Sequence, residues 1–271
     1  MLAIKNNIMA ESAARHLGRA YDALATSVER LSSGLRINSS KDDAAGLAVR
    51  ELIRADIAVI KQGSRNASDA ISMLQMFEGA LAAVDDALIR MNELAEQAAT
   101  GTYSAQQRRI MDAEFQEMAQ EITRIATKTE FNTVTMLDSA TGVNTIHFGS
   151  GSTLTVNSVD VTAAALGITS AIDITTAANA TTAMSMIGSA IRVKDSARAS
   201  FGYKMNRIES TATVLDIQAE NMMAAESRIS DVDVATEMAT MTRNQVLAQA
   251  GISMLSQANV MPQMALTLLR G

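Results

Sequence analysis

Residues 10–35 read AESAARHLGRAYDALATSVERLSSGL, and their apolar side chains recur in alternating steps of four and three residues. This spacing is typical of the seam along which one helix packs lengthwise against another. A second run with the same spacing, residues 234–259, lies near the other end of the chain. We therefore expect a mainly α fold in which long, coiled-coil-like helices from both chain ends run antiparallel and pack together. The residues expected to form these terminal seams are Leu17, Tyr21, Leu24, Val28, Leu31, Met238, Met241, Ile252, Leu255, Leu268 and Leu269.

The composition favours helices through most of the chain. Its 271 residues include one proline, Pro262, no cysteine, no tryptophan and eighteen methionines. Because proline is the strongest helix breaker, almost the whole chain is free to be helical. The lack of cysteine excludes disulfides, thiolate metal ligands and cysteine nucleophiles. A net charge of −6 argues against a nucleic-acid-binding protein, which normally presents a basic face.

A long internal helix is expected to follow the first terminal helix. Ser40, Asp42 and Asp43 indicate a helix start, where the carboxylates of the two aspartates would lie near the positive end of the helix dipole. The helix could run to about Ala99, and Gly101 would end it. Its apolar residues form two neighbouring stripes, which is typical of a helix wedged between several others.

The middle of the chain has a different character. A shorter helix capped by Ser104 comes first. Residues 131–183 then contain no Lys or Arg and many Thr, Ser and Gly. Alternation of polar and apolar residues over 145–148 and 153–156, with Gly-Ser-Gly between them, predicts a small β-hairpin. Helix returns near Ala183, so the β insertion is flanked by helices on both sides.

The sequence offers no set of residues for catalysis. His16 and His147 are the two imidazoles, and they lie in unrelated segments, so surface or packing roles are favoured over a metal site. The His-Glu-x-x-His, Gly-x-Ser-x-Gly and phosphate-loop motifs are absent. We therefore expect no enzymatic activity, no cofactor and no metal.

No cleaved signal peptide and no membrane span are expected. Charged and amide side chains interrupt the apolar residues of positions 1–17. Residues 244–269 carry no charge, but they include six Asn or Gln side chains, whose amides are costly in lipid. This segment is interpreted as a packed helix with a polar seam.

Residues 31–48 read LSSGLRINSSKDDAAGLA and look like the N-terminal signature of bacterial flagellins. Residues 64–72 with 78–81, residues 129–132 and residues 227–270 resemble the same family in the same order. The family resemblance implies a subunit that polymerises into the filament of the bacterial flagellum and so serves swimming motility. The resemblance covers about residues 1–130 and 184–271, so only the central segment between them lies outside it.

The resemblance also implies a division into domains. Residues 1–36 and 237–271 would pair as the coiled-coil domain of an inner tube. Residues 37–236 would form a helical-rod domain around it, with the β insertion at about 131–183. The variable outer domains of larger flagellins would be missing. Because isolated helices are marginal without tertiary packing, burial of the terminal seams by added subunits is expected to drive polymerisation.

The expected partners follow from the same family resemblance. They are copies of the chain itself, the flagellar type III export apparatus, hook-associated and cap proteins, and a chaperone on the C-terminal helix, residues 232–271. The location would be the extracellular filament, without membrane insertion or nucleic acid. In many flagellins an innate immune receptor of the Toll-like class binds a motif matched here by Arg90, Leu94 and Glu114. The same residues could instead form a surface between subunits.

Three other interpretations remain open from the sequence. The nearest is a hook–filament junction protein of the same superfamily, which shares the terminal helices but caps a filament. A secreted enzyme carried on flagellin-like arms would need a catalytic insertion, and residues 131–183 hold none. A free-standing coiled-coil adhesin would explain the heptads but not residues 31–48. The length of that signature favours the filament subunit.

Overall fold

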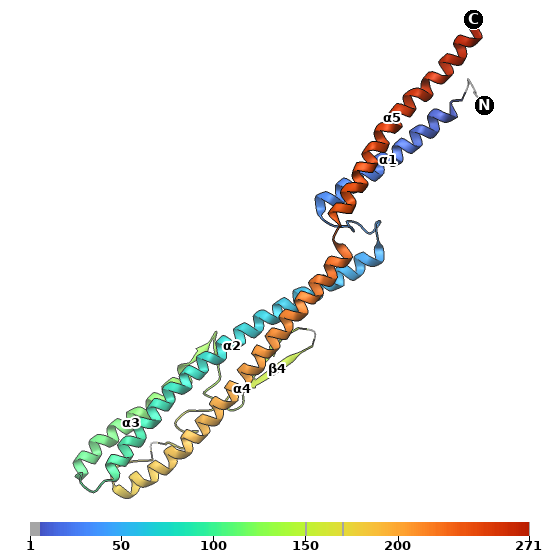
Figure 1. Ribbon diagram of the computed structural model, residues 1–271. Coiled ribbons are helices and arrows are strands. Elements are labelled where there is room, and N and C mark those ends of the chain that lie inside the picture. The colour runs from blue at the N-terminus through green and yellow to red at the C-terminus, as the bar shows by residue number, and fades with distance from the viewer. Residues whose placement is uncertain (1–5, 150, 170, 271) are drawn as a thin grey trace. The chain divides into compact units, whose positions relative to one another are not determined.

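The computed structural model describes residues 6–149, 151–169 and 171–270, with the backbone alone at residue 263 and residues 265–270. The chain is mainly α-helical, as the sequence predicts (Figure 1). Its helices are α1 (Ile8–Ser33), α2 (Ala44–Ala99), α3 (Ala105–Lys128), α4 (Ala177–Ser230) and α5 (Val234–Arg270). Its strands are β1 (Glu130–Phe131), β2 (Val134–Thr135), β3 (Val143–His147) and β4 (Thr153–Asn157).

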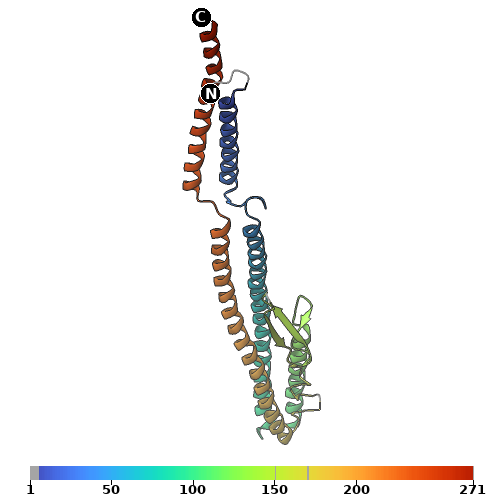
Figure 2. The ribbon, with the colours of Figure 1, turned by 90° about the vertical axis from the view of Figure 1, so that its right-hand side faces the viewer.

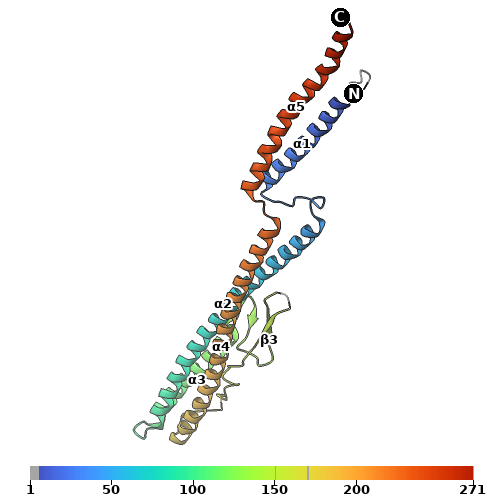
Figure 3. The ribbon, with the colours of Figure 1, turned by 45° about the vertical axis from the view of Figure 1, so that its right-hand side comes forward.

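The chain divides into two compact units, and both α2 and α4 contribute to each of them. Unit 1 comprises residues 1–55 and 221–271, and unit 2 comprises residues 56–220. In unit 1 the helices α1 and α5 lie side by side in all three views (Figures 1, 2 and 3). The predicted packing of the two chain ends against each other is therefore confirmed.

Local capping sets the ends of the helices. The Asn7 side chain accepts a hydrogen bond from the Ala10 amide at the start of α1, and Gly34 ends that helix in the left-handed conformation, with φ of 73°. The Asp43 carboxylate accepts a bond from the Gly46 amide, 2.9 Å away, so α2 begins where the sequence predicts. At α3, Ser104 is the cap of a reciprocal capping box, as its position in the sequence indicates.

Unit 2 contains a helical core formed by α2, α3 and α4. The α2 helix is buried along two stripes, so the prediction of a wedged helix is confirmed. Burial of each large apolar side chain stabilises the unit by about 2 kcal/mol. The largest buried apolar side chains include Phe77, Leu74, Leu81, Leu88 and Met91 of α2, Phe115 and Ile122 of α3, and Phe201 of α4.

The predicted β-hairpin is formed by β3 and β4, and it docks on α2. Inward-facing residues of β4 are buried, while the alternate ones are exposed. Gly63 provides the docking place, because a Cβ added there would lie 2.1 Å from the carbonyl oxygen of Phe148. The Asn66 amide also donates a hydrogen bond of 2.8 Å to the carbonyl oxygen of His147. Gly63 therefore leaves α2 continuous and makes room for the hairpin backbone.

A second, shorter hairpin was not predicted. It joins β1 to β2 through Asn132 and Thr133, whose φ angles are 48° and 67°. Positive φ at both central residues is typical of the two-residue turn whose twist matches that of the strands. Because Thr rarely adopts this conformation, residue types alone do not indicate the turn.

Candidate assembly site

The contact between α1 and α5 runs through small side chains. The least exposed residues of each helix follow heptad spacing. A Cβ added to Gly251 of α5 would lie 3.1 Å from Cδ1 of Leu17 on α1, so the two helices approach closely. The seam comprises Ala13, Leu17, Ala20, Leu24, Ser27 and Leu31 of α1, and Met241, Asn244, Ala248, Gly251, Leu255 and Ala258 of α5.

Polar contacts near both ends of this seam fix its direction and register. The side-chain amide of Asn7 donates a hydrogen bond of 2.8 Å to the carbonyl oxygen of Ala258. Toward the other end of α1, Arg30 lies 3.7 Å from the Glu237 carboxylate. Because the start of α1 contacts the later part of α5 and the end of α1 contacts its beginning, the pair is antiparallel. This direction agrees with the sequence prediction.

The structure differs from the predicted seams at every second position. Tyr21, Val28, Met238 and Ile252 are 48, 50, 45 and 50% exposed. The smaller residues Ala20, Ser27 and Gly251 occupy the seam positions next to Tyr21, Val28 and Ile252. Large side chains at these positions would hold the helices apart, whereas Ala, Ser and Gly let them approach. The side chains of Leu268 and Leu269 lie outside the described part of the chain. Leu17, Leu24, Leu31, Met241 and Leu255 do lie in the seam.

The displaced residues leave apolar surface beside the seam. Near the chain ends a shallow depression is lined by Ile8, Met9, Ala13, Gly251 and Met254, together with Ser12 and His16. Ile8, Met9 and Met254 are largely exposed. Among the described side chains, no group of three or more His, Asp or Glu residues could hold a metal. The depression is thus mainly apolar.

A junction, defined as residues 34–43 and 231–233, connects the terminal helices to α2 and α4. Leu35 and Asp231 form an isolated antiparallel β-bridge. The Arg36 amide donates to the carbonyl oxygen of Ser230 at 2.6 Å, and the Val232 amide donates to that of Gly34 at 3.1 Å. The two connections are therefore joined by their backbones.

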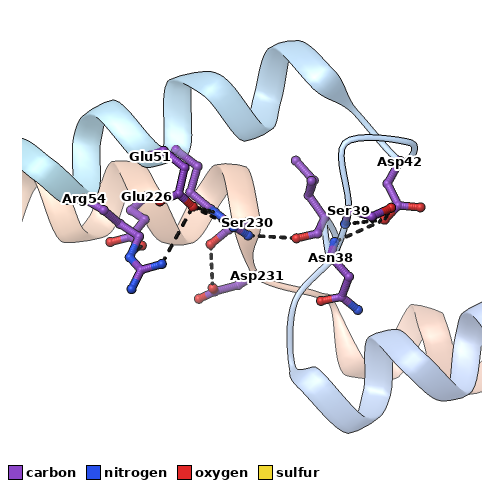
Figure 4. A network of polar contacts seen from close by, with 10 residues as sticks. Asn38, Ser39, Asp42, Glu51, Arg54, Glu226, Ser230 and Asp231 are labelled. Atoms are coloured by element: carbon purple, nitrogen blue, oxygen red, sulfur yellow. Dashed lines mark hydrogen bonds and ion pairs between the residues drawn. The ribbon is translucent and has the colours of Figure 1, made fainter.

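Charged side chains surround the junction (Figure 4). The Arg50 guanidinium donates to the carbonyl oxygen of buried Ile37 at 2.8 Å and contacts the Glu51 carboxylate at 2.8 Å. That guanidinium lowers the pKa of Glu51 through its hydrogen bond and its charge. Further along the helices, Arg54 of α2 lies 3.9 Å from Glu226 of α4. The Arg54–Glu226 contact links the start of α2 to the end of α4.

Asp42 stabilises the turn that precedes α2. Its Oδ2 atom accepts hydrogen bonds from the Ser39 amide at 2.9 Å and the Asn38 amide at 3.2 Å. Donation from the Ser39 backbone is the main cause of the lowered pKa of Asp42. Asp42 therefore acts as an anionic acceptor that holds the turn.

Arg90 and Glu114 form an ion pair between α2 and α3. The Arg90 Nη2 atom lies 2.7 Å from Glu114 Oε1, and a second contact of 3.1 Å reaches Glu93. The hydrogen bond with Glu114 is the main cause of the raised pKa of Arg90. Leu94 is 2% exposed, so its side chain belongs to the core beneath this surface. Arg90 and Glu114 therefore lie at the surface, whereas Leu94 does not.

Comparison with known proteins explains this arrangement. Residues 4–141 match the model of the bacterial flagellin N-terminal helical region, and residues 184–269 match that of the C-terminal helical region. The chain belongs to the bacterial flagellin family. Its segment between the two matched regions contains β3 and β4, as the sequence analysis anticipated for the part without family resemblance.

Individual relatives match over nearly the whole flagellin chain. A flagellin of Halalkalibacterium halodurans is 41% identical, with 98% of this chain and 99% of the relative covered. The flagellar filament 33 kDa core protein of Treponema phagedenis is 39% identical over the same shares. A Bacillus cereus flagellin crystal structure is similar with a TM-score of 0.50 and 33% identity, covering 60% of this chain and 94% of that one.

This flagellin is a structural subunit of the flagellar filament and serves motility. It assembles with copies of itself, and it is not an enzyme. Among the described residues, no helix combines the length and the apolar character needed to span a membrane. The candidate assembly site is the α1–α5 pair with its exposed apolar residues.

Proposed function

We propose that the α1–α5 pair forms the inner tube of the filament. In this division, residues 1–36 and 237–271 make the tube, and residues 37–236 make the shell around it. The observation that supports the proposal is the placement of Tyr21, Val28 and Ile252, which are large, apolar and about half exposed beside a narrow seam. About half of each of these side chains is left uncovered in the described part of a single subunit, so we infer that copies of the chain cover it.

The exposed residues supply the free energy of assembly. Completing the burial of one half-exposed side chain of this kind stabilises a contact by about 1 kcal/mol. Tyr21, Val28, Met238 and Ile252 together would contribute on the order of 4 kcal/mol for each added subunit. When one surface of a subunit binds a different surface of the next, and the contact does not close into a ring, a helical filament results.

The other partners are proposed on the character of α5. Exposed apolar residues such as Val246, Leu247 and Met254 lie on a helix whose last 26 residues before Arg270 carry no charge. Such a surface needs protection before assembly. We assign this role to a chaperone on residues 232–271, followed by type III export to the extracellular filament, where cap and hook-associated proteins contact the polymer ends.

For the surface at Arg90 and Glu114 we propose contacts between subunits. The ion pair between these residues leaves both side chains about half exposed and therefore accessible to a neighbouring copy. Leu94 would act from the core by supporting the backbone of α2 at this point.

The tube proposal is tested by charged substitutions beside the seam. Val28→Asp and Ile252→Asp would leave the α1–α5 seam intact but place a carboxylate in the proposed contact between copies. Val143→Asp is the matched control, because Val143 is also exposed but lies on β3. Elongation of short filament seeds, followed by electron microscopy, should stop for the first two variants and continue for the control. Normal elongation by Val28→Asp and Ile252→Asp would refute the proposal.

A further inference from the structure

Lys194 is a charged residue in the core of unit 2. Its side chain is 2% exposed, and among the described residues it is the one buried side chain that carries a charge. It lies in the middle of a heptad series of buried α4 residues, Ile187, Ala190, Lys194, Ala197 and Phe201. A lysine at a core position of a coiled coil lowers stability but restricts how the helices align.

Two carboxylates neutralise this lysine. Its Nζ atom lies 2.5 Å from Oδ1 of Asp85 on α2 and 2.7 Å from Oδ1 of Asp195 on α4 itself. Burial alone would lower the pKa of Lys194, but the hydrogen bonds and charges of the two aspartates outweigh burial and raise it. The lysine is therefore charged, and its partner on the neighbouring helix is Asp85.

Other polar contacts between α2 and α4 agree with this alignment but cannot enforce it. Ser64 donates to Asp216 at 2.9 Å, and Arg198 contacts Glu78 at 3.1 Å. Together with the Lys194–Asp85 contact, these two contacts show that α2 and α4 run antiparallel. Ser64–Asp216 and Glu78–Arg198 lie in contact with solvent, where ion pairs and hydrogen bonds contribute little and can be replaced by water.

The pair of buried Lys194 and partly buried Asp85 distinguishes the observed alignment from its nearest competitors. The rest of the contact consists of apolar residues at heptad spacing, which a shift of seven residues, about 10 Å, would bring back into a similar pattern. Such a shift would place Asp85 opposite Ile187 or Phe201 in place of Lys194. Asp85, whose side chain is 28% exposed, would then face an apolar core residue without its cation, which is unfavourable for a partly buried carboxylate.

We propose that Lys194 and Asp85 set the register of α4 against α2, so that every flagellin subunit presents the same outer surface to its neighbours. The pair lies within one chain and joins α2 to α4, so it acts by positioning these helices. Replacing it by apolar residues should preserve or raise stability, because desolvating two charges offsets much of their attraction. The loss would be in the uniqueness of the alignment.

The experiment measures register directly by cross-linking. Because the chain has no cysteine, pairs can be introduced without background. Ser64→Cys with Asp216→Cys reports the native register. Ser64→Cys with Glu209→Cys or with Met223→Cys reports a shift of one heptad in either direction. All partner positions on α4 are exposed. A short bifunctional maleimide is applied to unassembled subunits, so the result does not depend on the tube proposal.

Each cysteine pair is placed in the parent chain, in Lys194→Met, in Asp85→Leu/Lys194→Met, and in the charge-swapped Asp85→Lys/Lys194→Asp. We expect the ratio of shifted to native cross-links to rise roughly tenfold or more in the two apolar variants, and to return toward the parent value after the swap. Circular dichroism should show unchanged helix content. Should Lys194→Met not fold, the double variant, which leaves no unpaired carboxylate at position 85, decides the question. A parental ratio in the folded apolar variants would overturn the proposal, as would a swapped variant that shifts as much as they do.

Discussion

Gly63→Ala is a substitution for which local propensity and tertiary packing predict opposite signs. In a helix interior, alanine is more stable than glycine by about 1 kcal/mol. At Gly63, however, the added Cβ would lie 2.1 Å from the carbonyl oxygen of Phe148 and 2.6 Å from its carbonyl carbon. These are backbone atoms, so no side-chain rotation can relieve the clash. The β3–β4 hairpin must move away from α2.

The cost can be worked out from what the hairpin loses. Phe148 is 3% exposed, and uncovering its ring costs about 2 kcal/mol. The hydrogen bond from Asn66 to the carbonyl oxygen of His147 contributes about 1 kcal/mol. Subtracting the gain in helix propensity leaves a net loss of about 2 kcal/mol. Partial repacking of the hairpin would reduce this loss without changing its sign.

Urea unfolding followed by circular dichroism measures the effect. Gly79→Ala is the control, because Gly79 also lies in α2 and a Cβ there would meet nothing within 4 Å. We expect Gly79→Ala to stabilise the flagellin by up to about 1 kcal/mol and Gly63→Ala to destabilise it. If both substitutions stabilised it equally, Gly63 would not be the docking place for the hairpin backbone.

Further predictions concern the assembly site and the surface of unit 2. Gly251→Leu should separate α1 from α5, because its side chain would meet Leu17, and hydrogen exchange along α1 should become faster; unchanged protection would contradict close packing. Because the pKa of Asp42 is lowered in the folded state, its stabilising contribution is complete above the usual pKa of 3.8 and is lost as the pH falls through the lower pKa of the folded state. Asp42→Asn should therefore make unfolding less sensitive to acid. An unchanged pH profile of unfolding would exclude this role. Leu94→Ala should destabilise the fold by about 3 kcal/mol, whereas Arg90→Ala should change thermal unfolding little; similar effects of the two would contradict their assigned positions.

The helices could be predicted because their signals are local. The start of α2 follows from the capping residue Asp43, and its end at Ala99 follows from the nearby Gly101. The capping box at Ser104 is readable in the same way. Such signals involve residues three or four positions apart, so the sequence alone displays both partners.

The seams could be predicted only in part. The spacing predicts Tyr21 and Val28 as seam residues, whereas the structure places their smaller neighbours Ala20 and Ser27 in the contact. Heptad spacing does not distinguish two stripes that differ by one residue. The distance between α1 and α5 decides which of the two stripes lies in the contact, and this distance depends on both helices together.

Contacts between distant segments were outside the reach of sequence patterns. The junction joins Leu35 to Asp231 through backbone atoms, which leave no side-chain signature. Lys194 lies within the apolar series of α4 that runs from Ile187 to Phe201, although a charged side chain is rarely buried at such a position. A charged residue within an otherwise regular apolar series is the signal that could have found it.

The backbone pairing at the junction has a mechanical consequence. A filament that drives swimming transmits torque through every subunit, and pulling on a terminal helix would load the connection at residues 34–43 or at residues 231–233. Because the Leu35–Asp231 bridge joins these two connections, tension applied to one of them is shared by both. Hydrogen bonds strained simultaneously give way at a higher force than bonds peeled apart one after another, so the coupling protects each helix end from unravelling.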